Sequence, residues 1–225
     1  MLSVENISFS YGKRKIVDDL SFHARSGECV VLAGPNGSGK STALSIMAGA
    51  LKPSAGSVRV GGRVGYVPQG TALLEDATVE ENLRFFASLQ KCRVPDTLPF
   101  SVETYKKRKV SALSGGMKKQ VSIACAMIGD PEVILLDEPC AALDIAFRDE
   151  MTELIKGWKR GGRAIVYVGH EPSEFYDVFD TLILMSKPAE IYTREALADA
   201  ARTAETFASF YREKLKDMKK GEQHL

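Results

Sequence analysis

The nine residues Gly34–Thr42 read GPNGSGKST, and they follow the apolar run Cys29–Ala33. In this pattern a glycine-rich backbone presents N–H groups to phosphate oxygens, Lys40 reaches the terminal phosphates and the Ser41 hydroxyl binds Mg²⁺. That function requires a strand before the loop and a helix after it, and the flanking sequence is suited to both. We therefore expect a nucleotide site with contacts from Gly34, Pro35, Asn36, Gly37, Ser38, Gly39, Lys40, Ser41 and Thr42.

Short apolar runs alternate along the chain with segments in which apolar residues recur at helical spacing. Several runs lack polar alternation, which is typical of parallel strands covered on both faces. The expected strands are Ser3–Phe9, Leu20–Ala24, Cys29–Ala33, Ser57–Val60, Val64–Val67, Val133–Leu136, Ala164–Val168 and Thr181–Met185. The expected helices are Lys40–Ala50, Thr78–Leu89, Met117–Ile128, Ile145–Arg160 and Arg194–Ala201. This alternation predicts an α/β fold.

The stretch from Gly70 to Ala112 breaks this rhythm. It has helical signals and no good candidate for a buried strand, and Thr78-x-x-Glu81 forms a capping box that predicts a helix start. We interpret residues 70–112 as a small helical subdomain inserted into a single domain that spans residues 1–225.

A helical tail is expected from about residue 196 to residue 225. Its apolar residues recur at helical spacing, at Phe207, Phe210, Tyr211, Leu215 and Met218. Such a helix either packs on its own domain or contacts a second molecule, and the sequence leaves both readings open.

The composition limits the classes of function. Thirty lysines and arginines against 29 acidic residues give a net charge of +1, so no strong field favours nucleic acid or a membrane surface. No apolar run approaches the roughly 20 residues that cross a bilayer, and no secretory signal is visible. The four cysteines lack C-x-x-C spacing, which favours reduced thiols in a cytosolic protein. We expect no nucleic-acid partner and no direct membrane insertion.

An acidic pair ends the apolar run VILLDE. Asp137 lies where open α/β sheets place their ligand chemistry, and it can bind Mg²⁺ directly or through water. Glu138 follows at once and is free to accept a proton from an attacking water. A strand-end helix cap would explain the pair equally well if it stood alone. Beside a phosphate loop, the metal and general-base interpretation is favoured.

A second glycine-rich stretch, Leu113-Ser114-Gly115-Gly116, precedes another expected helix. An ordinary loop with a serine N-cap is one reading of it. The other is a second phosphate cradle, since a helix N-terminus attracts anions. A second phosphate site is expected if two copies of the chain share a nucleotide. One copy would then bind the nucleotide through its Gly34–Thr42 loop, and the other would close that site with Ser114 and Gly116.

Taken in order, these stretches resemble the ATP-binding cassette (ABC) ATPase family, over nearly the whole chain to about residue 190. The motifs that carry the resemblance are Tyr11 in SFSYGKRKIVDD, GPNGSGKST, Gln69 in YVPQG, LSGGMKKQ, VILLDEP, Ala142-Leu143-Asp144 and His170 in VGHE. The chain departs from the family at Cys140 and Gly169, where Thr or Ser is more frequent. Neither departure removes a catalytic group, and we expect Cys140 to be a small buried thiol.

The resemblance implies a role for each matching position. Tyr11 would stack on adenine, and Gln69 would approach Mg²⁺ and the attacking water. Asp144 would cross a dimer interface with Ser114, Gly115 and Gly116, and His170 would contact the γ-phosphate. The catalytic set is then Glu138, His170 and Gln69, and the Mg²⁺ set is Ser41, Gln69 and Asp137. The implied fold has a phosphate-loop core with a mostly parallel sheet, an N-terminal antiparallel β subdomain and the inserted helical subdomain.

The function implied is an ATP-hydrolysing subunit that dimerises around two ATP–Mg²⁺, with itself or a homologous subunit. It would power transport through separate membrane-spanning subunits at the inner face of the cell membrane. The sequence of its motifs is closer to that of bacterial exporters. The alternative is a cytosolic ABC ATPase such as an iron–sulfur assembly scaffold subunit. A small-molecule kinase would not explain LSGG or His170.

Overall fold

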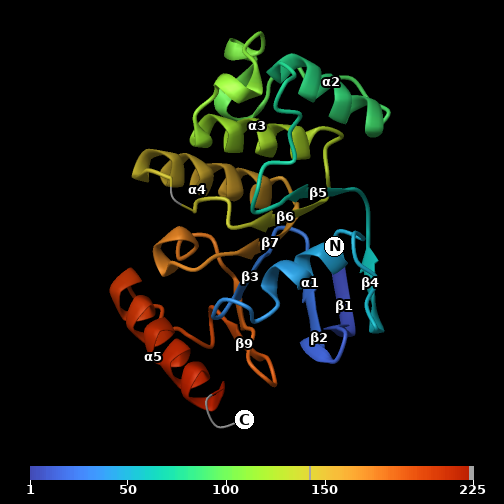
Figure 1. Ribbon diagram of the computed structural model, residues 1–225. Helices are drawn as coiled ribbons and strands as arrows, with labels where there is room; N and C mark the ends of the chain where they lie inside the picture. The colour runs from blue at the N-terminus through green and yellow to red at the C-terminus, as the bar shows by residue number, and fades with distance from the viewer. Residues whose placement is uncertain (142, 223–225) are drawn as a thin grey trace.

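The computed structural model describes residues 1–141 and 143–222; Ala142, from the Ala-Leu-Asp stretch, lies outside the described residues. The described chain forms two sheets with helices around them (Figure 1). The smaller sheet is antiparallel, in the order β2-β1-β4. Its strands are β1 (Leu2–Tyr11), β2 (Arg14–Ala24) and β4 (Ala55–Val60). This is the expected N-terminal antiparallel subdomain.

The larger sheet has the order β5-β6-β7-β3-β8-β9, and only β9 runs antiparallel to its neighbour. Its central strands are short and entirely buried, which explains their unbroken apolar sequences. The strands are β3 (Cys29–Ala33), β5 (Val64–Val67), β6 (Val133–Asp137), β7 (Ala164–Val168), β8 (Thr181–Leu184) and β9 (Glu190–Thr193). The predicted α/β class with a mostly parallel sheet is confirmed.

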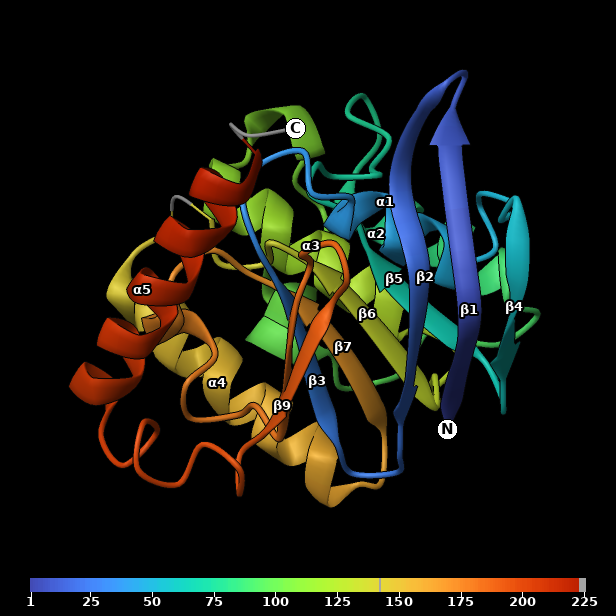
Figure 2. The same cartoon turned by 90° about the horizontal axis from the view of Figure 1, so that it is seen from below.

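The two faces of the larger sheet have separate hydrophobic cores. The first face meets α1 (Lys40–Met47) and the antiparallel sheet, with Leu32, Leu44 and Val166 in a common core. The second meets α4 (Ile145–Arg160) and α5 (Ala204–Glu222), through residues such as Ile155 and Phe207. Figures 1 and 2 both place α5 across the molecule from the antiparallel sheet.

A third core holds the helical region together. It joins α2 (Val79–Leu89), the 3₁₀ helices η1 (Pro99–Tyr105) and η2 (Val110–Ala112), and α3 (Gly115–Met127). In Figure 1 these elements gather at one end of the molecule, beyond α4. The Thr78 capping box is present, with the Glu81 backbone N–H donating to Thr78 Oγ1 at 3.2 Å. Since α3 shares this core, the helical region extends past residue 112.

The expected helix at Arg194–Ala201 is wrong, because these residues form turns and α5 begins at Ala204. The Arg194 backbone N–H donates to the Asp180 carbonyl at 2.7 Å, which ties this segment to the sheet. The Thr206 N–H donates to Thr203 Oγ1 at 3.2 Å, so Thr203 caps the later helix. Strand β9 was also not expected.

The tail helix packs on its own domain. Phe207 and Tyr211 are buried in the core of the second sheet face, with Phe210, Leu215 and Met218 packed against it. The chain therefore adopts the first of the two readings open for this helix. No helix among residues 1–141 and 143–222 is both long and apolar enough to cross a membrane.

Candidate nucleotide site

The Gly34–Thr42 loop connects β3 to α1, at the carboxyl end of the parallel strands. Gly39 precedes α1 with φ +97°, and a Cβ there would lie 2.8 Å from the Ile16 carbonyl oxygen. Only glycine fits both conditions. Lys40 is 5% exposed, and its Nζ donates to the carbonyls of Gly34 at 2.9 Å and Pro35 at 2.8 Å. The lysine is thus held over the loop, and burial lowers its pKa.

Asp137 ends β6 beside the first turn of α1. The Ser41 hydroxyl donates to Asp137 Oδ1 at 3.2 Å, which brings together the two oxygens expected for Mg²⁺. Burial raises the pKa of Asp137, although Lys40 and Lys119 both attract its charge. Hard oxygen donors of this kind suit Mg²⁺, which keeps most of its ligands as water and phosphate oxygens. Ser41 and Asp137 fit such an ion.

Glu138 contacts the two other predicted catalytic residues, Gln69 and His170. Its Oε2 accepts from Gln69 Nε2 at 2.9 Å, and its Oε1 lies 2.6 Å from His170 Nε2. The backbone has φ +48°, a conformation that costs a non-glycine residue on the order of 1 kcal/mol or more. The Glu138 N–H donates to the Val168 carbonyl at 3.0 Å, which fixes this turn next to the strand that leads to His170.

These groups line one cleft with a volume of about 570 Å³. Tyr11 lies at its wall, 57% exposed, with its ring edge-on to Phe9 at 5.0 Å between centroids. The lining consists of Tyr11, Arg14, Ile16, Asn36, Gly37, Gly39, Lys40, Ser41, Thr42, Gln69, Glu138 and His170. A cleft that combines an exposed aromatic ring, the backbone of a glycine-rich loop, a lysine and the Glu138 carboxylate suits a nucleoside triphosphate.

The second glycine-rich stretch lies outside this cleft. Ser114 caps α3, where its Oγ accepts from the Met117 N–H at 3.2 Å, as the ordinary N-cap reading requires. Ser114 and Gly115 are nevertheless exposed, and a Cβ on Gly115 would meet no atom within 4 Å. Asp144 is also exposed and caps α4, accepting from the Phe147 N–H at 2.9 Å. The chain's own fold does not bring these residues to the cleft.

Two buried residues lie near the site, and the burial of Cys140 agrees with the expectation from the sequence. Cys140 is 1% exposed, and burial raises its thiol pKa to about 11, so the thiol is protonated at neutral pH. Lys119 is 7% exposed, with its Nζ 3.0 Å from the Pro68 carbonyl and 2.9 Å from the Gln69 carbonyl. The sequence does not predict this burial, because lysine is usually exposed.

Fold and cleft together define a phosphate-loop nucleoside triphosphatase with an inserted helical region. A family model described as ABC transporter matches residues 17–141. The Nod factor export ATP-binding protein I of Ralstonia nicotianae is 36% identical over 228 residues, which cover 88% of this chain and 71% of that protein. The chain therefore belongs to the ABC transporter family, and the predicted resemblance is confirmed.

Other relatives agree. The Nod factor export ATP-binding protein I of Paraburkholderia xenovorans is 39% identical, over 75% of this chain and 62% of that protein. The linearmycin resistance ATP-binding protein LnrL of Bacillus subtilis is 34% identical, over 77% of this chain and 62% of that protein. The aligned part thus spans less than two thirds of either relative.

A solved ATP-binding subunit of an ABC transporter has a TM-score of 0.78 at 26% identity, over 88% of this chain and 92% of that structure. That neighbour is an ATP-binding subunit, and membership of the family supports the predicted ATPase class.

Proposed function

We propose that this chain binds ATP in the cleft described above and hydrolyses it with Glu138 as the general base. The observation that carries the proposal is the Glu138 carboxylate, held between Gln69 at 2.9 Å and His170 at 2.6 Å beside the phosphate loop. A carboxylate in this position accepts the proton of a water that attacks the γ-phosphate, while Gln69 and His170 orient water and phosphate.

The remaining contacts of the nucleotide follow from the cleft. The exposed ring of Tyr11 stacks on the adenine, and base stacking on an aromatic contributes about 1–3 kcal/mol. Lys40 leaves the Gly34 and Pro35 carbonyls and pairs with phosphate oxygens instead. Ser41 and Asp137 would hold Mg²⁺, with Gln69 near it, and the bound ion would supply positive charge to offset the charge that develops on the transferred phosphoryl group.

A second molecule closes each site. Ser114, Gly115 and Asp144 are exposed, and neither they nor Gly116 line the cleft of their own chain, which supports contact with a nucleotide bound to a neighbour. ATP then stabilises a dimer, because these contacts exist only in the closed state. Sedimentation with and without ATP–Mg²⁺ tests this. An equally tight dimer in both conditions would contradict it.

The work of hydrolysis drives transport through membrane-spanning subunits on other chains, and the protein then lies at the inner face of the cell membrane. The relatives support this, since two of them are named for Nod factor export and linearmycin resistance. Export is therefore favoured over import. These names also favour transport over the alternative of an iron–sulfur assembly subunit.

Co-purification from detergent-solubilised membranes separates the two functions. A tagged chain that retains a membrane-spanning protein through gel filtration supports transport. Recovery only in a complex without any membrane protein would instead support the assembly function.

A further inference from the structure

Lys119 has a buried ammonium group, and the family resemblance assigns no role to this residue. Lys119 is on the second turn of α3, and only 7% of it is exposed. Lysine is almost never buried unless it is paired, because desolvating its charge costs several kcal/mol. A buried lysine in this position therefore needs hydrogen-bond acceptors or opposite charges that offset the cost of desolvation.

Its partners are two backbone carbonyls at the end of β5. Lys119 Nζ donates to the Pro68 oxygen at 3.0 Å and to the Gln69 oxygen at 2.9 Å. The carboxylates of Asp137 and Glu138 also attract the ammonium charge, while burial lowers the pKa of Lys119. The ammonium thus clamps the backbone of the loop that carries Gln69, next to the acidic end of β6.

The neighbouring lysine shows that this placement is specific. The Lys118 side chain is 22% exposed, and its Nζ pairs at 2.6 Å with Glu75, whose side chain is 52% exposed. A solvent-accessible pair of this kind contributes little to stability, about 0–1 kcal/mol. The two lysines share a helix and a residue type, but only Lys119 touches the Gln69 loop.

A continuous series of contacts runs from α3 to the carboxylate. Lys119 holds the Gln69 backbone, and the Gln69 side chain donates to Glu138 Oε2 at 2.9 Å. The exposed Ser114 is the N-cap of the same helix. We propose that Lys119 is a positioning residue, which fixes the Gln69 amide against Glu138 and ties that contact to α3. This inference rests on the proposed role of Glu138 in hydrolysis.

The test compares Lys119→Met with the matched control Lys118→Met. Methionine keeps the length and apolar stem of lysine but removes the donors. Hydrogen exchange of the nucleotide-free protein should become at least about 10-fold faster in the loop around Gln69 for Lys119→Met, and stay unchanged for Lys118→Met. This readout requires no catalysis, so it reports on the clamp by itself.

Turnover gives the second readout. Lys119→Met should lower kcat by about 10- to 100-fold with little change in KM for ATP, since displacement by about 1 Å has effects of this size. Lys119→Arg, which keeps a cation and donors, should recover part of the rate. In a Gln69→Ala background, Lys119→Met should have no further effect on kcat.

Two outcomes would overturn the inference, and a third separates it from the proposed role of Glu138. Unchanged exchange around Gln69 in a folded Lys119→Met protein would remove the clamp. Equal losses of kcat from Lys119→Met with and without Gln69 would remove the route through that residue. If Glu138→Gln hydrolyses ATP normally while Lys119→Met exchanges faster, the proposed role of Glu138 fails and the clamp remains.

Discussion

The Nε2 atom of His170 lies 2.6 Å from Oε1 of Glu138, although 32 residues separate them in sequence. Parallel pairing of β6 with β7 produces this contact, because Asp137 pairs with Val168 and both strands then end at the same edge. The Gln69 amide, which follows β5, binds the other carboxylate oxygen at 2.9 Å. Three adjacent strand ends thus fix one carboxylate, and this arrangement leads to the first prediction.

Replacement of Glu138 by Gln should lower ATP turnover by about 10²–10⁴-fold, because the amide cannot accept the water's proton. ATP binding should persist, since Lys40, Ser41 and Asp137 still hold the nucleotide. The variant should therefore accumulate as an ATP-bound dimer. Turnover and sedimentation in ATP–Mg²⁺ measure both effects. The exposed neighbour of His170 provides a control, Glu171→Gln, which should hydrolyse ATP normally. Turnover of Glu138→Gln within threefold of the parent would contradict a general base here.

Asp137→Asn should raise the thermal stability of the nucleotide-free protein and weaken its Mg²⁺-dependent ATP binding. Burial raises the Asp137 pKa above its ordinary value, so at pH 7 the folded state carries a charge that it disfavours. Asparagine removes that charge, and the nucleotide-free variant should have a higher Tm at pH 7. About 2–4 °C is expected for each kcal/mol relieved. Mg²⁺-dependent ATP binding should weaken, which titration of Mg²⁺ against a fixed ATP concentration measures.

The increase in Tm expected for Asp137→Asn should depend on pH in a definite direction. Because the folded pKa of Asp137 is raised, the folded parent takes up a proton before the unfolded chain does. The stability advantage of Asp137→Asn should therefore be full above the raised pKa and fade as the pH falls through it. Thermal melts between about pH 4 and pH 8 follow this change. A difference in Tm that grows on acidification would contradict the assigned cause.

Ser114→Arg should abolish hydrolysis while ATP binding to the monomer persists, since Ser114 lies outside the cleft of its own chain. The arginine places a bulky cation where a neighbour's nucleotide is expected. It also removes the α3 cap, which costs about 1 kcal/mol of stability. Equilibrium ATP binding and turnover are measured together.

Thr78→Arg is the matched control for the lost cap. Thr78 caps α2 in the same helical region, so this variant loses a comparable capping contact without altering the second cradle. It should melt earlier than the parent yet hydrolyse ATP. Loss of ATP binding by the Ser114→Arg monomer would show instead that Ser114 serves its own site.

Gly169→Ala should destabilise the protein by about 1–3 kcal/mol, as overpacking of a core does. A Cβ on Gly169 would lie 2.6 Å from Cε1 of Tyr167, whose side chain is fully buried and cannot swing away. Turnover should also fall, because His170 is the next residue. Chemical denaturation and kcat measure the two effects.

The same substitution in α4 should act in the opposite direction. A Cβ on Gly157 would meet only the end of the Arg160 side chain, at 3.9 Å. Gly157→Ala should therefore stabilise the helix by about 0.5–1 kcal/mol, with turnover unchanged. Destabilisation by both substitutions would mean that the clash with Tyr167 is not the cause at Gly169.

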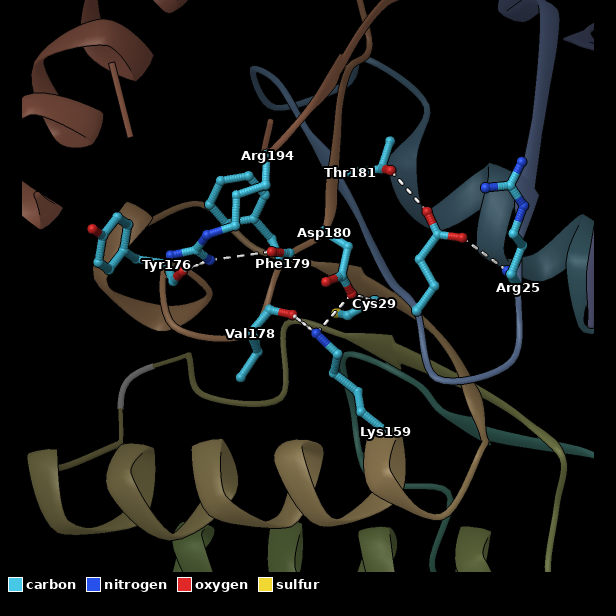
Figure 3. A network of polar contacts seen from close by, with 10 residues as sticks. Arg25, Cys29, Lys159, Tyr176, Val178, Phe179, Asp180, Thr181 and Arg194 are labelled. Carbon is cyan, nitrogen blue, oxygen red and sulfur yellow. Dashed lines mark hydrogen bonds and ion pairs between the residues drawn. The ribbon is translucent and has the colours of Figure 1, made fainter. Parts of the chain in front are cut away.

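The C-terminal segment shows why one sequence-based assignment was wrong. In Figure 3, Arg194 lies against Tyr176 and Phe179, and its Nη1 donates to the Tyr176 carbonyl at 2.6 Å. Its guanidinium also lies over the Phe179 ring, 4.7 Å from the centroid. These long-range contacts hold Arg194 in a turn, and periodicity alone does not report them. The nearby Thr203 and Thr206 form a local capping contact, which hydrophobic periodicity does not indicate.

The same figure shows how the start of β8 is fixed. Asp180 Oδ2 accepts from the Cys29 N–H and from Lys159 Nζ, each at 2.7 Å. The contact joins the starts of two neighbouring strands to the end of α4. Sequence separation of 151 residues between Cys29 and Asp180 leaves no local pattern from which to infer it.

The sequence by itself determined what depends on local chemistry. Local sequence patterns predicted the phosphate loop, the acidic end of β6, the capping box and the buried strands. Each of these features depends on the types and spacing of residues that are neighbours in the chain. Tertiary structure alone decided which strand ends lie side by side, and so which groups touch Glu138. It also decided that one lysine of the pair at 118 and 119 is buried under the Gln69 loop, since burial depends on the packing of distant segments.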